Sequence, residues 1–360
     1  MNPLGQRIAE LIAANGPLSV AQFMSLCQFD PDGGSYTTRQ SIGRDFITSP
    51  EISQTFGEML GLWVAQCWHD QGRPENVRLV ELGPGRGTLM ADLLRTLTAA
   101  VPQFLFDAEV VLVEASPFLA TAQRSKLANF AATVDLQWKD RFDESLADKP
   151  LFLIANEFFD CLPLRQFVKT ERGWCERMIG LKDGAFAFAL APEPGLNEPP
   201  GGQSAPLGAV YEIAPAAAVL SGEIARIVAA QGGAAAIIDY GYEETGFGET
   251  LQAIAGGEFA EVLSNPGTSD LSAHVDFSAL KRAGEEAGAM VLGPVTQCNF
   301  LADLGIGPRG ERLIVANPTE ARQIAAAIDR LVNPAEMGAL FKVVALAPNT
   351  LSRMPGFGLG

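Results

Sequence analysis

Histidine is the scarcest reactive residue of this chain, which has only two in 360 residues, His69 and His274. A hydrolase with a serine or cysteine nucleophile takes a histidine as its general base, so this class is disfavoured. The five cysteines are odd in number, widely scattered and without a C-x-x-C pair. We therefore expect neither a metal site nor a disulfide framework.

Positive charge is also in short supply, and long apolar runs are missing. The chain has 26 lysine and arginine residues against 42 aspartate and glutamate residues, a net charge of −16. Nucleic-acid binding needs basic side chains to neutralise phosphates, so such a partner is disfavoured. No apolar run reaches the ~18 residues of a membrane helix, so no membrane span is expected. The first ten residues match neither a signal nor a transit peptide and predict a cytoplasmic protein.

Apolar residues, in contrast, are plentiful. They make up 48% of the chain, and only 19% of its residues are charged. This balance favours a well-packed globular protein. The length permits one large elaborated domain, or a core with a smaller lobe.

The most informative stretch is Leu79–Thr88, which reads LVELGPGRGT, an apolar strand that runs into a glycine-rich turn. Gly83, Gly85 and Gly87 lack Cβ atoms, so the turn can adopt positive φ and approach a ligand closely. A dinucleotide fingerprint places its third glycine one position later, where this chain has Thr88. The alternative is a tight strand-to-helix turn that binds nothing.

Two carboxylates flank this turn in the expected sheet. Glu81 lies two residues before the first glycine, where a carboxylate suits a positively charged ligand better than a pyrophosphate. S-adenosylmethionine (SAM), with its sulfonium and ammonium groups, is such a ligand. The apolar run 109–114 predicts a second buried parallel strand that ends in Glu114. Glu114 could accept both ribose hydroxyls of an adenosine, or it could cap a helix that follows at Ser116 and Pro117.

Two more expected strands end in polar side chains. The strand 134–138 precedes Asp140, a candidate for the adenine amino group, and the strand 151–155 precedes Asn156. Ligands of open α/β sheets bind at the carboxyl ends of the strands. We therefore add Asp140 and Asn156 to the candidate cofactor-binding residues.

The N-terminal region predicts helices separated by a long loop. Residues 3–27 and 50–70 show helical periodicity, and the polar segment 30–49 lies between them. Ser49 and Pro50 are typical of the N-cap and first position of the second helix. A loop of that length in a compact domain is usually functional or disordered.

The C-terminal half predicts β hairpins and further α/β elements. Residues 165–190 alternate around an Asp183-Gly184 turn, and 191–208, rich in proline and glycine, predicts a surface loop. A last strand is expected at 339–346 and a loose tail at 355–360. The fold class is thus α/β, a Rossmann-like doubly wound sheet with an N-terminal helical cap and a β-rich insertion.

This reading divides the chain into five segments. They are a helical cap with a lid loop (1–75), a SAM-binding α/β core (76–160), a β-hairpin insertion (161–210), the remainder of the α/β core with substrate-side segments (211–350) and a loose tail (351–360).

Several longer blocks carry a resemblance to a known family. The chain is similar to the MidA-like SAM-dependent methyltransferases, which include mitochondrial complex I assembly factors and bacterial relatives. The blocks are DFITSPEISQTFGE (45–58), ELGPGRGTL (81–89), VEASP (113–117), NEFFDCLPLRQF (156–167) and IDYG (238–241), and PGTSDLSAHVDF (266–277), 294–306 and 337–343 extend the match.

The resemblance implies a class I methyltransferase fold and a bacterial member of the family. For the mitochondrial members it implies dimethylation of an arginine in a core subunit of respiratory complex I. It carries the cofactor role to Glu81, Gly83, Gly85, Gly87 and Glu114. The catalytic role falls on Glu157 and Asp160, with Asp45 and Glu51 closing over them.

The residues themselves are compatible with this chemistry. A guanidinium is protonated at neutral pH, so a site for it needs carboxylates that grip its planar fork and help to remove a proton. Glu157 and Asp160 supply carboxylates beside two phenylalanines just past the fourth strand. They could instead act as helix caps, and Asp45 could instead order its loop.

Two other functions stay open. One is a small-molecule O- or N-methyltransferase, and the other is a SAM-binding complex I assembly factor with little activity. The chain departs from the family on the presumed substrate side, at a short lid loop with Arg44, at Glu249 and at Gly256-Gly257. These departures leave the acceptor, the number of methyl groups and the oligomeric state undetermined.

Overall fold

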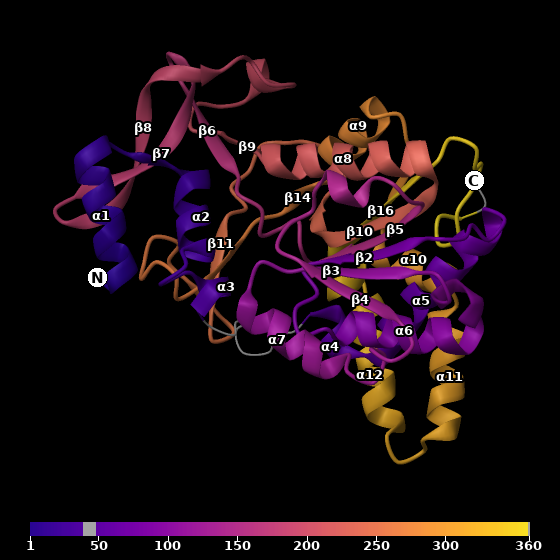
Figure 1. Ribbon diagram of the computed structural model, residues 1–360. Helices are drawn as coiled ribbons and strands as arrows, with labels where there is room; N and C mark the ends of the chain where they lie inside the picture. Colours follow the sequence, from indigo (N-terminus) through magenta and orange to yellow (C-terminus); the bar gives the residue numbers. More distant parts are fainter. Residues whose placement is uncertain (39–47, 359–360) are drawn as a thin grey trace. The chain divides into compact units, whose positions relative to one another are not determined.

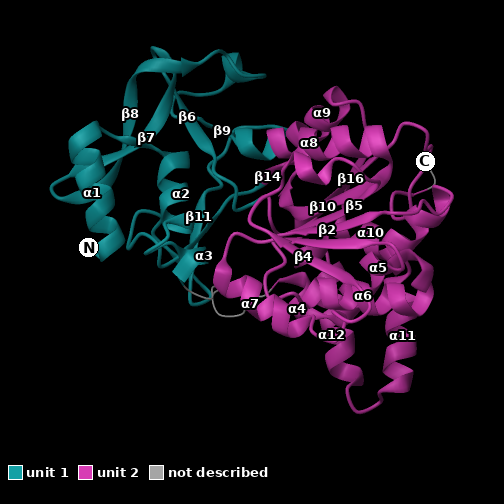
Figure 2. Cartoon of the chain, viewed as in Figure 1, with its two compact units in different colours: residues 1–46, 160–218, 244–274 teal, residues 47–159, 219–243, 275–360 magenta. Residues whose placement is uncertain are grey.

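The computed structural model describes residues 1–38 and 48–358, which fall into two compact units (Figure 2). Unit 1 comprises residues 1–46, 160–218 and 244–274, and unit 2 comprises 47–159, 219–243 and 275–360. The N-terminal segment expected as one cap over 1–75 therefore divides, because its second half packs within unit 2.

Unit 2 is built on a mixed sheet whose main strands run in the order β15-β16-β10-β5-β2-β3-β4. The five strands from β10 to β4 are parallel, whereas β16 is antiparallel to β10 and β15 is antiparallel to β16. The strands are β2 (Arg78–Leu82), β3 (Glu109–Val113), β4 (Asp135–Lys139), β5 (Leu151–Asn156), β10 (Gly233–Tyr242), β15 (Met290–Thr296) and β16 (Phe341–Ala347), and β14 (Val275–Asp276) pairs with β10. Continuous burial of β2, β3 and β5 explains their apolar runs and confirms the α/β prediction.

Helices cover both faces of this sheet. Figure 1 shows α8 and α9 on one side and α5 and α6 on the other. The helices that belong wholly or mostly to unit 2 are α4 (Ser49–Ile52), α5 (Gln54–Asp70), α6 (Thr88–Ala100), α7 (Pro117–Lys126), α8 (Pro215–Gln231), α9 (Phe277–Glu286), α10 (Gln297–Asp303), α11 (Ile306–Ala316), α12 (Ala321–Val332) and α13 (Met337–Leu340). A Cβ atom on Gly57 of α5 would lie 2.5 Å from the Cβ of Asp92, so a glycine lets α5 and α6 pack closely.

Two predictions for unit 2 were wrong in detail. The helix expected after an N-cap at Ser49 is two helices. The N-cap of α4 is Thr48, one residue earlier than predicted, and an extended Ser53 separates α4 from α5 and caps α5 by accepting from the Thr55 amide (3.2 Å). The C-terminal tail is packed as far as residue 358. The Trp63 indole donates to the Pro355 carbonyl (3.1 Å), and the Phe357 ring contacts the Phe300 ring. The tail therefore buries apolar surface against unit 2, which favours the packed conformation.

Unit 1 combines N-terminal helices with antiparallel sheets. Its elements are α1 (Pro3–Asn15), β1 (Leu18–Ser19), α2 (Val20–Phe29), α3 (Ser35–Thr38), β6 (Arg165–Thr170), β7 (Gly173–Lys182), β8 (Ala185–Leu196), β9 (Val210–Ile213), β11 (Gln252–Ala255), β12 (Glu258–Ala260) and β13 (Asp270–Ser272). The β7–β8 turn has positive φ at both Asp183 and Gly184 (53° and 80°), which confirms the predicted hairpin. Strand β8 continues to Leu196, so the surface loop expected from residue 191 starts later than predicted.

Candidate cofactor and acceptor site

The glycine turn follows β2 and leads into α6. Gly83, Gly85 and Gly87 all have positive φ, at 61°, 55° and 78°. A Cβ on Gly83 would lie 2.6 Å from the ring of Phe158, and a Cβ on Gly87 would lie 3.3 Å from Gln123. The turn therefore requires glycine for both its conformation and its close packing.

Glu81 is a buried carboxylate that forms no ion pair with the residues that the structure describes. Its side chain lies in β2 at 3% exposure, and among the described residues its Oε2 atom has no hydrogen-bond partner. Burial raises its pKa to about 8, and the nearby Glu114 carboxylate adds to the shift. A buried acceptor of this kind fits a ligand that brings a positive charge.

Glu114 follows β3 and is oriented by two donors. Its Oε1 accepts from the Ser116 amide (2.8 Å), and its Oε2 accepts from the Gln123 side chain (2.9 Å). Burial still raises its pKa to about 7. Helix α7 is capped by Ser116, whose hydroxyl accepts from the Leu119 amide, so the helix-cap alternative falls to Ser116 and not to Glu114.

Gln123 is a site residue that the sequence reading missed. It is fully buried in α7, and its Nε2 donates to both the Gly85 carbonyl (2.8 Å) and Glu114. Its Oε1 accepts from the Trp138 indole (3.0 Å). A glutamine in a helix gives no signal of such a role, although its spacing of four from the buried Leu119 marks the inner face of the helix.

The outer part of this sheet edge is more exposed. Asp140 directly follows β4 and is exposed. The Arg124 guanidinium lies 4.0 Å from the ring centre of Trp138, which belongs to β4. Glu51 of α4 accepts from the Thr88 hydroxyl (2.6 Å), so α4 is tied to the start of α6 within unit 2.

Glu157 lies just past β5 and is held in an unusual conformation. Its φ is +51°, a left-handed value that is rare for a residue with a side chain. Its Oε1 accepts from the Ser49 amide (2.7 Å) and from the Asn156 side chain (3.0 Å). Burial raises its pKa. Asn156 is itself buried, and its Oδ1 has no hydrogen-bond partner among the described residues.

Of the other two predicted catalytic residues, Asp160 lies in the described part of the chain. Asp160 belongs to unit 1, where its carbonyl accepts from the Ala273 amide (3.0 Å). In the same unit the Tyr36 hydroxyl donates to Asp270, and burial, then the Asp270 charge and lesser contributions from Cys161 and Asp160, raise the pKa of Tyr36. Asp45 lies outside the described residues.

Two of the family departures have local structural roles in unit 1. Glu249 forms an ion pair with Arg177. Gly256 and Gly257 have φ values of 62° and 82° and form the turn between β11 and β12.

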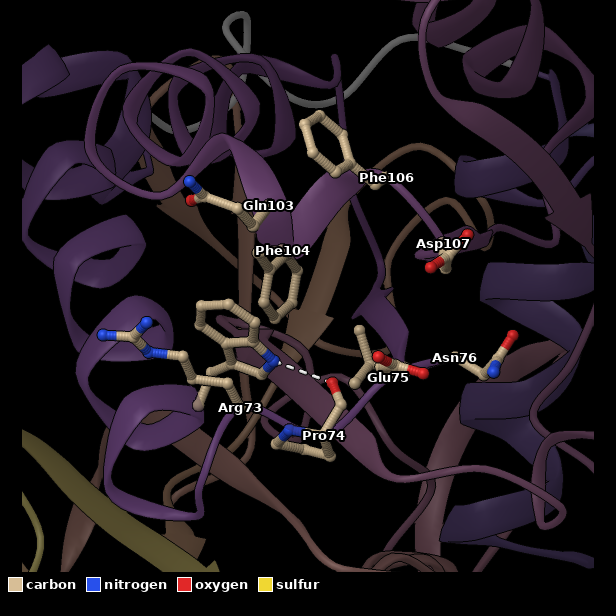
Figure 3. Close-up of a pocket in the computed structure, with 10 residues that line it drawn as sticks. Arg73, Pro74, Glu75, Asn76, Gln103, Phe104, Phe106 and Asp107 are labelled. Carbon is tan, nitrogen blue, oxygen red and sulfur yellow. Dashed lines mark hydrogen bonds between the residues drawn. The ribbon is translucent and has the colours of Figure 1, made fainter.

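A pocket of about 280 Å³ lies elsewhere in unit 2 (Figure 3). Val77 and Asp107, which line it, precede β2 and β3, so the pocket is at the amino ends of these strands. Glu75 and Asp107 lie on one side of it and Arg73 on the other. The pocket is therefore at the opposite edge of the sheet from the glycine turn, and it is not the cofactor site.

Comparison with known proteins identifies the family of this chain. A family of S-adenosyl-L-methionine-dependent methyltransferases matches residues 59–295. The chain is 36% identical to the mitochondrial protein arginine methyltransferase NDUFAF7 of Xenopus tropicalis, over 97% of this chain and 86% of that protein. The chain belongs to the MidA-like methyltransferase family. The human NDUFAF7 protein is 35% identical over 97% of this methyltransferase and 84% of its own length.

A solved structure agrees with the cofactor assignment. A COG1565 superfamily member from Burkholderia thailandensis, crystallised with S-adenosyl-homocysteine bound, is 30% identical and has a TM-score of 0.87, over 99% of this chain and 95% of that one. The class I methyltransferase fold and the dependence on SAM are thereby confirmed. The orphaned Glu81 oxygen and the Cβ-free turn fit this cofactor, so Glu81, Glu114 and the turn are the residues that would hold it.

The expected location was wrong. The chain was predicted to be a cytoplasmic bacterial protein, but the curated relatives named above are mitochondrial proteins. No helix in the described part of the chain combines the length and apolar character needed to cross a bilayer.

Proposed function

We propose that this methyltransferase modifies an arginine side chain of a protein, with Glu157 as the residue that receives the guanidinium. The observation that carries the proposal is the placement of Glu157: a half-buried carboxylate just past β5, followed by Phe158, whose ring lies against Gly83 of the cofactor turn. The names of the relatives support the same activity.

The chemistry follows from the charge of the acceptor. When bound, SAM supplies a methyl group on a positively charged sulfur. A guanidinium must lose one proton as it gains a methyl group, and Glu157 would accept that proton. Its raised pKa makes it a better base than an exposed carboxylate, and its two donors, Ser49 and Asn156, hold it in place. We retain Asp160 and Asp45 as further acceptor-side candidates.

A core subunit of respiratory complex I is the acceptor to test first, because the family resemblance implies it. Each purified core subunit would be incubated with the enzyme and SAM carrying a tritiated methyl group. Labelled subunits would then be hydrolysed, and the methylarginines separated by chromatography. We expect label in methylarginine of one subunit, and its loss in Glu157→Gln with SAM affinity changed by less than about threefold, because the substituted group faces the acceptor.

Glu75→Gln is the matched control, since Glu75 is an exposed carboxylate at the opposite edge of the sheet. It should leave both activity and affinity unchanged. Equal loss of activity and SAM affinity in Glu157→Gln would remove Glu157 from the acceptor site. Label in small molecules of a protein-free extract would favour a small-molecule methyltransferase. Tight SAM binding without any transfer would favour an assembly factor with little activity.

A further inference from the structure

Asp239 is a fully buried carboxylate to which the proposed function assigns no role. It lies in β10 and accepts three main-chain hydrogen bonds. Its Oδ2 accepts from the amides of Phe158 (3.1 Å) and Phe159 (2.9 Å), and its Oδ1 accepts from its neighbour Tyr240 (2.9 Å). A carboxylate that accepts several amide hydrogens is strongly held, so it fixes the backbone that donates to it.

The segment fixed in this way is the turn that carries Glu157. Strand β10 pairs Ile238 with Asn156, and the Glu157 amide donates to the Ile238 carbonyl (2.9 Å). The main-chain hydrogen bonds between β5 and β10 end at this pair, and the next two amides, of Phe158 and Phe159, donate to the Asp239 side chain instead. The left-handed φ of Glu157 is strained for a residue with a side chain, so it persists only where neighbouring contacts enforce it.

The same carboxylate also sets the position of the Phe158 ring. Because this ring lies against Gly83, its backbone position determines how the acceptor side meets the cofactor turn. Phe158 and Phe159 also contact each other edge to face, with ring centres 5.8 Å apart. A shift of either amide would therefore displace Glu157 and change the contact between the Phe158 ring and Gly83.

We infer that Asp239 is a positioning residue for methyl transfer: it holds the Phe158 and Phe159 amides, and through them the Glu157 carboxylate and the wall of the cofactor turn. The inference rests on the proposed role of Glu157. It requires a carboxylate, because both oxygens accept N–H groups. In an asparagine one of these positions becomes an NH₂ group, which would face an amide donor in either orientation.

Asp239→Asn is the direct test, with the labelled complex I subunit as acceptor. We expect kcat to fall about 100-fold, since a misplacement near 1 Å has that effect, while the Kd for SAM changes far less. The acid limb of the kcat profile should move to lower pH, because a released Glu157 loses the burial that raises its pKa. In a Glu157→Gln background the same substitution should have little further effect.

Asp92→Asn is the matched control, because Asp92 is a buried carboxylate of unit 2 that accepts a hydrogen bond from Arg95 of its own helix, α6 (2.8 Å). It should leave the acid limb of the kcat profile unmoved. Asp239→Ser, which keeps one acceptor, replaces Asp239→Asn if that variant does not fold. Additive losses in the double variant, or an unmoved acid limb, would overturn the positioning role.

Hydrogen exchange separates this inference from the proposed function. The Phe158 and Phe159 amides should exchange faster in Asp239→Asn than in the wild type or in Asp92→Asn. Unchanged exchange would overturn the inference even if arginine methylation is found. If Glu157→Gln keeps full activity, the proposed role of Glu157 fails, and the positioning role fails with it. The hydrogen bonds to Asp239 would then be structural.

Discussion

Two buried glutamates on neighbouring strands of unit 2 behave in opposite ways. Glu109, at the amino end of β3, accepts from Arg78 (2.6 Å) and Lys149 (2.9 Å), whereas Glu81, near the carboxyl end of β2, has an oxygen without a donor in the described chain. Burial tends to raise the pKa of Glu109, but the hydrogen bonds from Lys149 and Arg78 outweigh it, and the net pKa is lowered. The pKa of Glu81 rises to about 8.

The contrast shows that burial alone does not mark a functional carboxylate. Both residues are less than 10% exposed, Glu109 at 8% and Glu81 at 3%. What distinguishes them is the countercharge, which the protein itself supplies to Glu109 at the amino edge and which, under the proposed role of Glu81, the cofactor would supply at the carboxyl edge. The following substitutions test this difference between the two edges.

The largest effect is expected from paired glycine substitutions at the two edges. In Gly83→Ala the new Cβ would lie 2.6 Å from the Phe158 ring, so we expect SAM binding to be lost. Gly72 has a similar φ of 79° but open space around it, so Gly72→Ala should cost only about 1–2 kcal/mol of stability. Calorimetric titration with SAM and urea unfolding would measure the two effects. Equal SAM affinity in both variants would show that the turn is not the cofactor site.

A substitution at the amino edge should affect stability and leave cofactor binding intact. Arg78→Met leaves Glu109 without its buried partner, which we expect to cost about 3–5 kcal/mol of the free energy of unfolding. Lys149→Met removes a donor to the same carboxylate that is 32% exposed, so its cost should be about 1 kcal/mol or less. Urea unfolding gives both values, and a similar loss in the two variants would contradict this account.

The smallest effect concerns pH. Glu81 and Glu114 have pKa values raised to about 8 and about 7, so SAM affinity should rise with pH through this range as both carboxylates ionise. Without cofactor the sign is opposite: the stability due to the raised pKa of Glu81 is full below its ordinary value of 4.5 and is lost as pH rises through 8. Calorimetry at pH 6 and pH 8.5 measures the first trend, and melting curves measure the second.

Glu81→Gln sharpens the same point. It should weaken SAM binding about tenfold at pH 8.5, the magnitude of one charged hydrogen bond, and remove the upper part of the pH dependence. It should also flatten the loss of stability at high pH. A wild-type affinity that does not change between pH 6 and pH 8.5 would exclude Glu81 as a ligand for the cofactor's positive charge.

The carboxyl edge of the sheet was largely predictable from the sequence. The glycine turn, Glu81 and Glu114 belong to consecutive β-α-β units, so their relation follows from short stretches of chain and a general rule for such sheets. The hairpin at Asp183-Gly184 was predictable for the same reason, because its turn residues are adjacent.

The contacts that hold these groups were not predictable. Gln123 is 38 residues from Gly85, Ser49 is 108 residues from Glu157, and Asp239 is 80 residues from Phe159. Polar side chains at such separations leave no periodic pattern in the sequence, so only the fold reveals their pairing. Likewise, the periodicity of residues 50–70 predicted one continuous helix, but the extended Ser53 divides it into α4 and α5. A single extended residue does not change the apolar spacing, so this break left no sign in the sequence.

Gln123 has a consequence for how the cofactor is recognised. One amide group joins the glycine turn, the Glu114 carboxylate and the Trp138 indole into a single network. Under the proposed roles of these residues, the part of the site that would meet the adenosine and the part that would meet the amino-acid end are therefore ordered together. Adenosine or methionine, added as a separate fragment, would contact only one part of this network, although binding orders the whole of it. The sum of the two fragments' binding free energies should therefore fall short of the binding free energy of the intact cofactor.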